Sequence, residues 1–526
     1  NGLIKITFFY DPNIIANVKT LSGKEWNSAG KFWTAELCIE SINALKLWGF
    51  DVAEELLIEL NKLSAEVKPI KIEGLKKNLY PFQEQGVAFI ESKNGRVLLA
   101  DEMGCGKTIQ ALAYLHLHPE LRPVVIVTPA SLKLNWEREI LNTLSDKRVI
   151  AVLSGKNDSG HALPDADIYI INYDILSSWQ EKLRAVRPQV VITDEAHYYK
   201  SKTTLRTKAV QALCKGVPHV LALTGTPIVN RPVEMFNAIN IVSSMIFPSW
   251  WKFVMRYCGA KKNFFGWDFN GASNIEELHE KLTRTIMLRR LKKDVLTELP
   301  AKIRSVIPMQ INRREYDRAE KDFILWLKEV DVEKASRAEN AEQLVKMEVL
   351  KQLAFRAKQA SVVDWITDFL EQENKLVVFC THKEAVDVLM NAFAGQTVKI
   401  DGSVSMIDRQ KAVDEFQNNP AVKLFVGNLR AAGVGITLTA ASSTAFVEFG
   451  WTPGEHDQAE DRIHRIGQDA ESVNIYYLVA EKTIEEDIAE LLDKKRKVIT
   501  AVLDGKEVEN ESLISELILT YKKESV

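Results

Sequence analysis

The segment Val97-Leu-Leu-Ala100-Asp-Glu-Met-Gly104-Cys-Gly106-Lys107-Thr108 joins a short apolar run to a stretch with helical periodicity. We expect a buried strand, a tight glycine turn and the start of a helix, in this order. Glycines in such a turn let backbone N–H groups face an anion, and the helix N-terminus adds a favourable dipole. The segment predicts a phosphate-binding loop, although Asp101 stands where the strict pattern has a glycine. A glycine turn without a ligand is the alternative for this segment alone.

Two residues of this loop carry side chains suited to a nucleotide. Lys107 would meet the β- and γ-phosphates, and the Thr108 hydroxyl would hold Mg²⁺. Further along, the apolar run Val190–Thr193 is followed by Asp194-Glu195-Ala196-His197. Carboxylates at the carboxyl end of a buried strand lie where Mg²⁺ and an attacking water need them. Asp194 would support the metal and Glu195 would polarise the water. Solvated acids at a strand end are the alternative for this segment taken by itself.

Apolar β-branched runs alternate with helical stretches from Leu79 to about Glu485. They form two series of five: Val97–Ala100, Val124–Thr128, Ile168–Ile171, Val190–Thr193 and Val220–Thr224, then Leu376–Cys380, Thr397–Ile400, Leu424–Val426, Thr444–Glu448 and Val473–Leu478. Short continuous apolar runs bounded by turns are typical of strands buried on both faces. They predict an α/β fold with two parallel sheets covered by helices.

Two parts of the chain differ from this pattern. A polar, helix-prone stretch from about Pro232 to Glu371 separates the two series and predicts helical insertions, including a solvated helix over Glu329–Glu348. The beginning of the chain has short strand-like pieces around a Trp-rich segment, Glu25–Trp33, and an amphipathic helix near Ala53–Leu63. It predicts a small N-terminal α+β module.

The composition excludes several classes of protein. The chain has 526 residues, of which 46% are hydrophobic and 26% charged, with a net charge of -3. Its length predicts about three domains, and its charge neither supports nor excludes a nucleic-acid partner. Five scattered cysteines without a C-x-x-C pair argue against a disulfide framework or zinc site and favour a reducing compartment. We expect no membrane helix and no signal peptide, and the start at Asn1 suggests a processed or trimmed chain.

Basic residues are concentrated in three further segments. Gln458-Ala-Glu-Asp-Arg462-Ile-His-Arg465-Ile-Gly-Gln468 places two arginines on one face of an expected helix. Such a pair can stabilise transition-state charge on a γ-phosphate, whereas exposed charges on a surface helix are the alternative. The cluster Arg289, Arg290, Lys292 and Lys293 is interpreted as a DNA contact or lobe coupling, or as a solvated helix face. Lys494-Lys-Arg-Lys497 is interpreted as a solvated helix end that can dock on the first sheet's domain.

The order of these segments resembles the helicase-like ATPases of superfamily two, and within them the Swi/Snf-type group. The resemblance covers Leu79 to Gly505. It rests also on Leu79-Tyr-Pro-Phe-Gln83, Val127-Thr-Pro129-Ala-Ser131-Leu with Asn135-Trp136, Ile171-Asn172-Tyr173, Leu223-Thr-Gly-Thr-Pro227, Met287-Leu-Arg-Arg-Leu-Lys-Lys-Asp-Val295, Asp401-Gly402-Ser403, Gly433-Val-Gly435-Ile-Thr437, Thr483-Ile-Glu-Glu486 and Val502-Leu-Asp-Gly505. It implies two RecA-like lobes that form one ATP cleft.

Other segments resemble one branch of this group, the SMARCA-like annealing helicases. The usual Ser-Thr-Arg-Ala-Gly-Gly segment reads Asn428-Leu-Arg-Ala-Ala-Gly433 here, so Leu429 and Ala432 supply neither a hydroxyl nor a bare backbone to DNA. The Ala-Ala pair, Thr437 and Trp451-Thr-Pro-Gly454 resemble that branch. Gly23-Lys-Glu-Trp26 and Lys31-Phe-Trp33, followed by 45–50, are similar to its HARP module, which would bind forked DNA. A small domain with core tryptophans is the alternative.

The resemblance implies a role for each part of the chain. We expect an accessory module over 1–72, a first RecA-like lobe with a helical protrusion over 73–303, a second such lobe over 304–485, and a C-terminal helical brace over 486–526. Catalysis is implied for Lys107, Asp194, Glu195, Arg462 and Arg465, with Mg²⁺ on Thr108 and Asp194. Nucleotide contact is implied for Gln83, Met103, Gly104, Cys105, Gly106, Lys107, Thr108, Ile109, Gly435 and Gln458. DNA contact is implied for Pro129, Ser131, Asn135, Trp136, Asn172, Tyr173, Lys200, Thr381, Gly402, Ser403 and Arg430.

The function that the resemblance implies is an ATP- and Mg²⁺-dependent translocase on double-stranded or forked DNA. It would bind without regard to sequence and anneal strands or remodel replication forks in DNA repair. A motor that removes DNA-bound proteins and a nucleotide-dependent DNA-binding scaffold are the alternatives, and the intact Glu195 argues against the scaffold. We expect a monomer without membrane association, in the nucleus of a eukaryote or the nucleoid and cytoplasm otherwise. The sequence indicates no particular protein partner.

Overall fold

The computed structural model divides the chain into two compact units, Asn1–Lys68 and Pro69–Val526. It describes residues 3–21, 23–37, 39–56, 68–156, 162–225, 232–263, 266–269, 271–296, 298–329, 337–432 and 435–492. Several expected features lie wholly or partly outside these ranges: the helix over 53–63, residues 330–336 of the stretch 329–348, Thr226-Pro227, Gly433, Lys494–Lys497, Val502–Gly505 and most of the C-terminal brace.

The first unit is an α+β module, as the sequence predicts. Its sheet has the antiparallel order β1-β3-β2, formed by β1 (Leu3–Ile6), β2 (Glu25–Asn27) and β3 (Phe32–Glu36). Helices α1 (Pro12–Val18) and α2 (Ile39–Leu47) complete it. Alternate strand residues such as Ile4, Ile6 and Ala35 join Val18 and Leu45 of the helices in one apolar core.

The first sheet of the second unit has seven parallel strands in the order β12-β4-β9-β8-β5-β7-β6. They are β4 (Arg96–Leu99), β5 (Val124–Thr128), β6 (Ile150–Val152), β7 (Ile168–Asn172), β8 (Val190–Asp194), β9 (His219–Leu223) and β12 (Met287–Leu288). Every residue of β5 and β7 is buried, which explains their continuous apolar sequence. All five runs of the first predicted series are strands.

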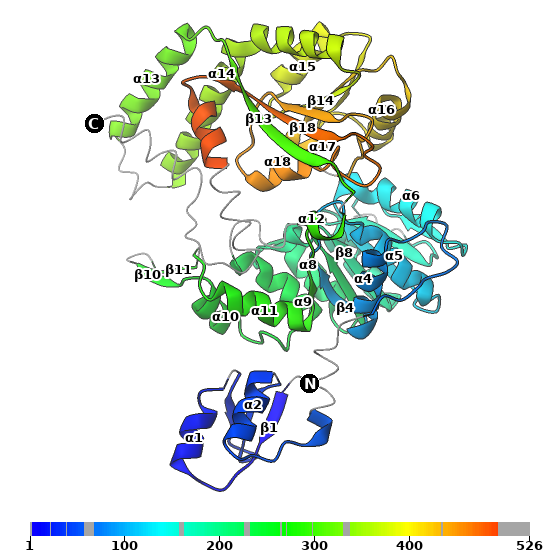
Figure 1. Cartoon of the computed structure of the whole chain (residues 1–526), viewed down its shortest axis with the longest axis vertical. Coiled ribbons are helices and arrows are strands. Elements are labelled where there is room, and N and C mark those ends of the chain that lie inside the picture. Colours follow the sequence, from blue (N-terminus) through cyan, green and yellow to red (C-terminus); the bar gives the residue numbers. More distant parts are fainter. Residues whose placement is uncertain are drawn as a thin grey trace. The chain divides into compact units, whose positions relative to one another are not determined.

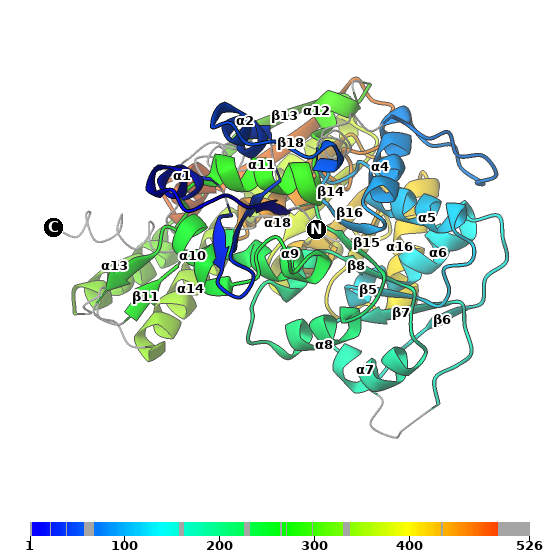
Figure 2. The same ribbon diagram turned by 90° about the horizontal axis from the view of Figure 1, so that it is seen from below.

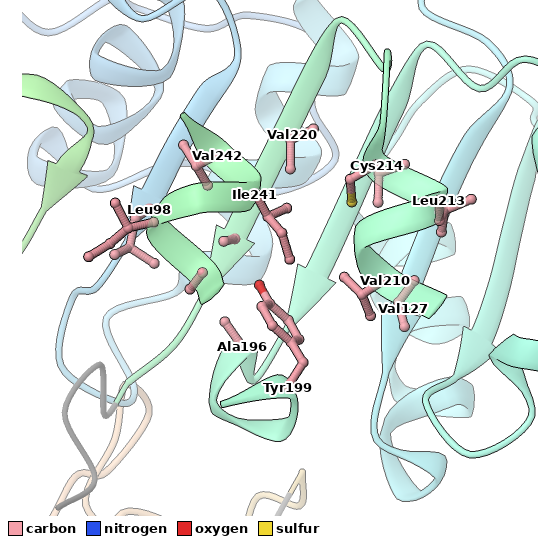
Figure 3. Packing of buried hydrophobic residues seen from close by; sticks show 14 of the residues in the cluster. Leu98, Val127, Ala196, Tyr199, Val210, Leu213, Cys214, Val220, Ile241 and Val242 are labelled. Atoms are coloured by element: carbon pink, nitrogen blue, oxygen red, sulfur yellow. The ribbon is translucent and has the colours of Figure 1, made fainter. Parts of the chain in front are cut away.

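Helices lie on both faces of this sheet and form with it the first lobe (Figures 1 and 2). They are α4 (Pro81–Ser92), α5 (Lys107–Leu117), α6 (Lys133–Thr143), α7 (Leu176–Ala185), α8 (Leu205–Cys214), α9 (Phe236–Val242), α10 (Trp250–Tyr257), α11 (Ile275–Thr285) and α12 (Lys292–Val295), with the short 3-10 turns η1 (Ala130–Leu132), η2 (Ala196–Tyr199) and η3 (Pro232–Met235). Tyr199 of η2 lies within the apolar core (Figure 3). Its hydroxyl shares a 2.9 Å hydrogen bond with Thr193 Oγ1, so the core fixes the turn that follows β8.

The second lobe is built on six parallel strands in the order β13-β18-β17-β14-β16-β15. The strands are β13 (Ala301–Met309), β14 (Leu376–Cys380), β15 (Thr397–Ile400), β16 (Leu424–Asn428), β17 (Ser443–Phe446) and β18 (Ser472–Ala480). Its helices are α13 (Arg314–Glu329), α14 (Arg337–Gln372), α15 (Lys383–Ala392), α16 (Met406–Asn418), α17 (Leu429–Ala432) and α18 (Pro453–Glu460). The two parallel sheets and their helices confirm the predicted α/β fold.

The stretch between the two strand series contains more β-structure than its polar sequence predicts. It holds β12, a hairpin of β10 (Lys261–Asn263) and β11 (Gly266–Asp268), and the nine-residue β13. Among the strands that the structure describes, β13 pairs only with β18, at the edge of the second sheet. An edge strand tolerates charged residues and proline. Because β13 contains Lys302, Arg304 and Pro308, its sequence does not form the continuous apolar run that predicts a buried strand. No described helix is long and apolar enough to cross a bilayer.

Candidate active site at the phosphate loop

The loop between β4 and α5 has the backbone that its glycines predict. Gly104 and Gly106 have φ values of 84° and 77°, which side chains rarely adopt. Helix α5 begins at Lys107, directly after Gly106. The Lys107 ammonium donates to the carbonyl oxygens of Asp101 at 2.7 Å and Glu102 at 3.3 Å. It therefore lies inside the loop, where a phosphate would compete for it.

Two neighbouring segments close around this loop. Gln83 of α4 is buried; its amide donates to the Cys105 carbonyl at 3.3 Å, and its side-chain oxygen accepts from the Tyr80 N–H at 3.0 Å. A Cβ on Gly106 would lie 2.4 Å from Gln83 Nε2, so a larger residue could not pass this amide. A Cβ on Gly225 would lie 2.2 Å from Met103. The predicted adenine-reading and coupling segments thus both contact the loop.

The other predicted loop residues are buried or half-buried rather than exposed. Met103 and Cys105 are buried, and burial raises the pKa of the Cys105 thiol to about 12. Cys105 therefore stays a neutral thiol at neutral pH. Thr108 and Ile109 lie in the first turn of α5 and are half-buried. The hydroxyl of Thr108 thus lies in the first helical turn after the loop.

Asp101, the residue that departs from the strict pattern, anchors the loop from behind. Its side chain is fully buried and pairs with Arg290, whose Nη2 and Nε lie 2.5 and 3.1 Å from the two carboxylate oxygens. Arg290 also donates to the Phe82 carbonyl and to Gln110. Arg289 donates to the Ala100 carbonyl at 2.8 Å. These two arginines belong to the loop's support, so neither the DNA contact nor the solvated face describes them.

Asp194 lies at the carboxyl end of β8 and is held by three polar neighbours. The indole of Trp136 donates to its Oδ2 at 2.8 Å, and the Thr128 hydroxyl lies 3.4 Å from the same oxygen. The Tyr173 hydroxyl donates to the Asp194 carbonyl at 2.6 Å. Trp136 and Tyr173 are buried. Their polar atoms therefore position Asp194, and the DNA contact that the resemblance implies for both stays a prediction.

Glu195 has a strained backbone and a lone carboxylate oxygen. Its φ and ψ of 54° and 58° lie in the left-handed region, which is costly for a residue with a side chain. Its buried Oε2 has no hydrogen-bond partner and lies 3.3 Å from His197 Nδ1. Such an oxygen is available to accept a hydrogen bond from a water molecule.

The two carboxylates differ in their electrostatic surroundings. Burial, and next the charge of Glu195, raise the pKa of Asp194 to about 6. Burial also acts to raise the pKa of Glu195, but His197, Lys107 and Arg462 outweigh it and lower that pKa. Glu195 is therefore ionised at neutral pH, and Asp194 carries excess negative potential that a cation would relieve.

This arrangement fits a nucleotide with a divalent cation. The described residues contain no group of three or more His, Cys, Asp or Glu side chains that could hold a metal by themselves. Mg²⁺ needs only one or two protein oxygens when substrate phosphates supply the others. Asp194 and Thr108 provide that number, and the ammonium of Lys107 provides a phosphate partner. The donor set therefore suits Mg²⁺ held jointly with a nucleotide.

The predicted arginines come from the second lobe, but not from one helix. Helix α18 ends at Glu460, and Arg462 and Arg465 lie in the turns after it, so the predicted shared helix face is wrong. The reason is that the backbone turns aside: the Arg462 carbonyl accepts from the Leu438 N–H and the His464 carbonyl accepts from Lys292. The arginines still converge, since each donates to the Ile436 carbonyl.

Arg462 is buried and Arg465 is half-buried. Burial, and next the charge of Arg465, lower the pKa of Arg462 to about 10, while Glu195 and Asp194 act in the opposite direction. Burial also lowers the pKa of Arg465. A Cβ on Gly104 would lie 3.5 Å from Arg465 Cβ, so the second lobe reaches the phosphate loop. Groups from both sheets therefore meet at one place, and the predicted nucleotide residue Gln458 supports Arg462 through its carbonyl.

Lys292 of α12 joins the two lobes. Its ammonium is buried and lies 2.7 Å from Asp461 Oδ1 and 2.9 Å from the His464 carbonyl. Lys302 of β13 contacts the same Asp461 oxygen at 3.0 Å. Burial acts to raise the pKa of Asp461, but the two lysines lower it. A Cβ on Gly104 would lie 2.9 Å from Lys292 Cε, so this lysine lies against the phosphate loop beside Arg465. Of the interpretations given for the basic cluster Arg289–Lys293, Lys292 therefore fits the coupling of the two lobes.

The remaining predicted DNA residues divide by exposure. Ser131 and Asn135 of the first lobe line a small cavity with Gly435, Ile436 and Arg409 of the second. Gly402 and Ser403 are exposed. Pro129 and Asn172 are buried at the ends of β5 and β7. Lys200 pairs with Glu234 at 3.0 Å. The Lys200 side chain is 40% exposed, and DNA contact stays a prediction for all seven residues.

Around Thr381 the second lobe holds a buried charge network. The backbone N–H groups of Thr381 and His382 both donate to Glu448 at 2.8 Å. The ring of His382 contacts Glu448 at 2.5 Å and Glu348 at 3.1 Å. Burial acts to lower the pKa of His382, but these two carboxylates raise it to about 9. The network ties the end of β14 to α14, and Thr381 is part of it.

Leu429 and Ala432, where the sequence departs from the Swi/Snf-type pattern, point into the second lobe. Both are buried, and a Cβ on Gly427 would lie 2.7 Å from Ala432 Cβ. Asn428 caps this turn by accepting from the Arg430 and Ala431 N–H groups at 3.2 and 3.3 Å. Arg430 itself is 77% exposed. Its guanidinium lies 3.5 Å from the Glu455 carboxylate. The departures thus change the packing behind this turn, and the phosphate contact of Arg430 stays a prediction.

Comparison with known proteins follows the same division of the chain. Residues 82–362 match the family model described as SNF2-related domain, and residues 358–467 match the helicase conserved C-terminal domain. The chain is 36% identical over 446 residues to the DNA annealing helicase and endonuclease ZRANB3 of Mus musculus, covering 82% of this chain and 41% of that protein.

Two further relatives carry the name SWI/SNF-related matrix-associated actin-dependent regulator of chromatin subfamily A-like protein 1. The protein of Xenopus tropicalis is 36% identical over 429 residues, which are 80% of this chain and 44% of the relative. The homolog of Caenorhabditis elegans is 31% identical over 525 residues, which are 95% of this chain and 74% of the relative. The chain thus spans less than half of the mouse and frog proteins and most of the nematode one.

Proposed function

The chain belongs to the SNF2-related family, and we propose that it is an ATP-dependent translocase on double-stranded DNA that anneals strands or remodels forks. One observation carries the proposal: Lys107, Asp194 and Glu195 of the first lobe meet Arg462 and Arg465 of the second at one phosphate loop. A scaffold that only binds nucleotide would need neither the strained Glu195 nor two arginines from the other lobe.

The residues of this site would share the work of hydrolysis. ATP and Mg²⁺ supply the phosphoryl group that passes to water and the charge that orients it. Lys107 and the loop N–H groups would bind phosphate oxygens, and Thr108 with Asp194 would hold the metal. Glu195 would orient the attacking water through its free oxygen. Arg462 and Arg465 would stabilise the charge that develops on the transferred group.

Turnover would depend on the position of the second lobe, because the two arginines enter the site from there. A change in the distance between lobes during each cycle would move DNA contacts of one lobe relative to those of the other. Ser131 and Asn135, which line the small cavity with Gly435, would contact a strand near this joint. We expect contacts to phosphates, hence sequence-independent and salt-sensitive binding.

The named relatives support the choice among translocase functions. One relative is called a DNA annealing helicase. The α+β module over 3–56 is proposed to bind forked DNA, as the HARP resemblance implies. The domain boundaries 1–72, 73–303, 304–485 and 486–526 remain part of this proposal. We propose a monomer that acts where chromosomal DNA lies, in a nucleus or a nucleoid.

Steady-state ATP hydrolysis tests the proposal. Wild type would be measured without DNA and with single-stranded, duplex and forked DNA, using Lys107→Ala as the blank. We expect strong stimulation by duplex and the largest by the fork. Equal stimulation by every duplex would reduce the proposal to a general translocase. No stimulation by any DNA, or substantial turnover by Lys107→Ala, would contradict it.

A further inference from the structure

Four aromatic rings form a patch on the first lobe, outside the nucleotide site. Trp250 and Trp251 begin α10, Trp267 lies on β11, and Phe269 follows that strand (Figure 1). Trp251 contacts Trp267 and Phe269 edge-on, with 5.5 and 5.7 Å between ring centroids. The rings of Trp267 and Phe269 are nearly parallel, 5° apart in orientation. We call these four residues the aromatic patch.

The patch has an inner and an outer pair. Trp250 and Phe269 are half-buried and pack against the core of the first lobe. Trp251 and Trp267 are 46% and 41% exposed. The inner pair therefore holds the outer pair in place, with Trp250 and Phe269 5.2 Å apart. Two indoles held rigidly at the surface lose little conformational freedom when a flat ligand stacks on them.

Lysines surround the outer pair. Lys252 of α10 and Lys261 and Lys262 of β10 are exposed. Lys262 lies directly opposite Trp267 in the hairpin, so both project from the same face. Lys202 places its ammonium 5.0 Å from the Trp250 ring. Because Lys202 follows η2, it connects the patch to the loop beyond Asp194 and Glu195.

We propose that the aromatic patch binds single-stranded DNA, with bases stacked on Trp251 and Trp267 and phosphates held by the neighbouring lysines. This inference rests on the proposed function and specifies its substrate: a duplex that continues into an unpaired strand. The patch would hold the unpaired arm of a fork while the two lobes hold the duplex.

The chemistry of the patch favours unpaired DNA over its competitors. Bases in a duplex are stacked on each other and offer no free face to a surface ring, whereas unpaired bases of any sequence do. An acidic protein partner would use the lysines but has no general need for two exposed indoles. Basic residues next to aromatic rings are the combination that single-strand-binding surfaces use.

Fluorescence anisotropy without nucleotide tests the inference on the full chain. The probes are a labelled oligo-dT, a blunt duplex, and the same duplex with an oligo-dT arm. We expect wild type to bind the armed duplex more tightly than the blunt one. The double variant Trp251→Ala/Trp267→Ala should lose about tenfold or more in affinity for oligo-dT and for the arm, with affinity for the blunt duplex unchanged.

Three variants and one second assay make the result decisive. Trp251→Phe/Trp267→Phe keeps flat rings and should retain most of the affinity, which separates stacking from misfolding. Lys261→Ala/Lys262→Ala should weaken arm binding and its salt dependence. Leu141→Ala removes another exposed apolar side chain and should change nothing. Duplex-stimulated ATP hydrolysis by the same samples reports on the proposed function separately.

Equal binding of all three probes by wild type and the alanine double variant would overturn the inference, even with ATP hydrolysis intact. Equal loss on blunt and armed duplex would overturn it too, because the patch would then act on DNA in general or on folding. Loss confined to the arm supports it even if no DNA stimulates ATP hydrolysis, a result that would remove only the translocase proposal.

Discussion

Replacing Lys292 by methionine should uncouple the arginine segment from the phosphate loop. The lysine side chain is 4% exposed, and its ammonium contacts Asp461 and the His464 carbonyl across the joint between the lobes. Methionine has a similar length and keeps the apolar part of this packing. It removes only the charge and the N–H donors, so the effect reports on the ion pair.

The magnitude follows from what remains after the substitution. Removing one partner of a buried ion pair costs about 3–5 kcal/mol, since the other charge is left without compensation. Asp461 keeps Lys302 at 3.0 Å, which places the expected cost near the lower end, about 3 kcal/mol. This energy corresponds to a fall of about 100-fold in the population with the lobes joined. Turnover at saturating ATP should fall by a similar factor.

Nucleotide affinity should change much less. Lys107, Thr108 and Gln83 all belong to the first lobe, and none of them contacts Lys292. DNA-stimulated ATP hydrolysis would be measured over a range of ATP concentrations to separate kcat from KM. A fluorescent nucleotide would report affinity directly. The expected pattern is a large loss in kcat with a small change in affinity.

Lys293 offers a matched control, because it is the next residue along the chain and is exposed. Lys293→Met should behave like wild type. Asp461→Asn should resemble Lys292→Met, and the double variant should be less impaired than the sum of the two. Equal turnover of Lys292→Met and Lys293→Met would refute the reasoning. Additive losses would mean that the two residues act separately.

Three other predictions concern the support of the site and of the second lobe. Asp101→Asn leaves Arg290 buried without its counter-ion and should destabilise the first lobe by about 3 kcal/mol and raise KM for ATP; unchanged thermal unfolding and KM would contradict this. Arg465→Ala should abolish turnover while ATP affinity persists, and normal turnover would remove its catalytic role. His382, with its pKa raised to about 9, stabilises the fold by about 3 kcal/mol below pH 6.5, and this contribution is lost as the pH rises through 9. The unfolding temperature of the wild type should therefore fall between about pH 6.5 and pH 9, and that of His382→Gln should fall less. Parallel plots of unfolding temperature against pH for the two proteins would contradict this role of His382.

The sequence was most informative where one structural cause dominates. Central parallel strands are buried on both faces, so their apolar runs predict them almost residue by residue, as for β5. The edge strand β13 has a single neighbour and carries Lys302 and Arg304, and apolar patterning does not find it. The glycine turn before Lys107 was predictable because residues other than glycine rarely adopt the positive φ of Gly104 and Gly106.

Long-range contacts were beyond the same reasoning. Trp136 looks like a DNA contact in the sequence, and only the fold places its indole on Asp194. The spacing of Arg462 and Arg465 predicts a shared helix face, but carbonyl contacts from other segments end the helix at Glu460. Spacing describes neighbours along the chain. The hydrogen bonds that position Trp136 and end the helix before Arg462 involve residues more than twenty positions away. The spacing of residues in a short segment gives no information about such partners.

The segment from Met287 to Val295 explains how the two lobes are connected. β12 adds its first two residues to the edge of the first sheet, Arg290 supports the phosphate loop through Asp101, and Lys292 reaches Asp461 in the second lobe. These contacts differ in what an opening of the lobes would break. The Arg290 pair lies within the first lobe and would persist, whereas the Lys292 pair would separate and leave Asp461 to Lys302. Because Asp461 precedes Arg462 directly, the carboxylate that Lys292 holds also sets where that arginine enters the site. Through the buried ammonium of Lys292, the segment therefore couples the conformation of the phosphate loop to the position of the two arginines.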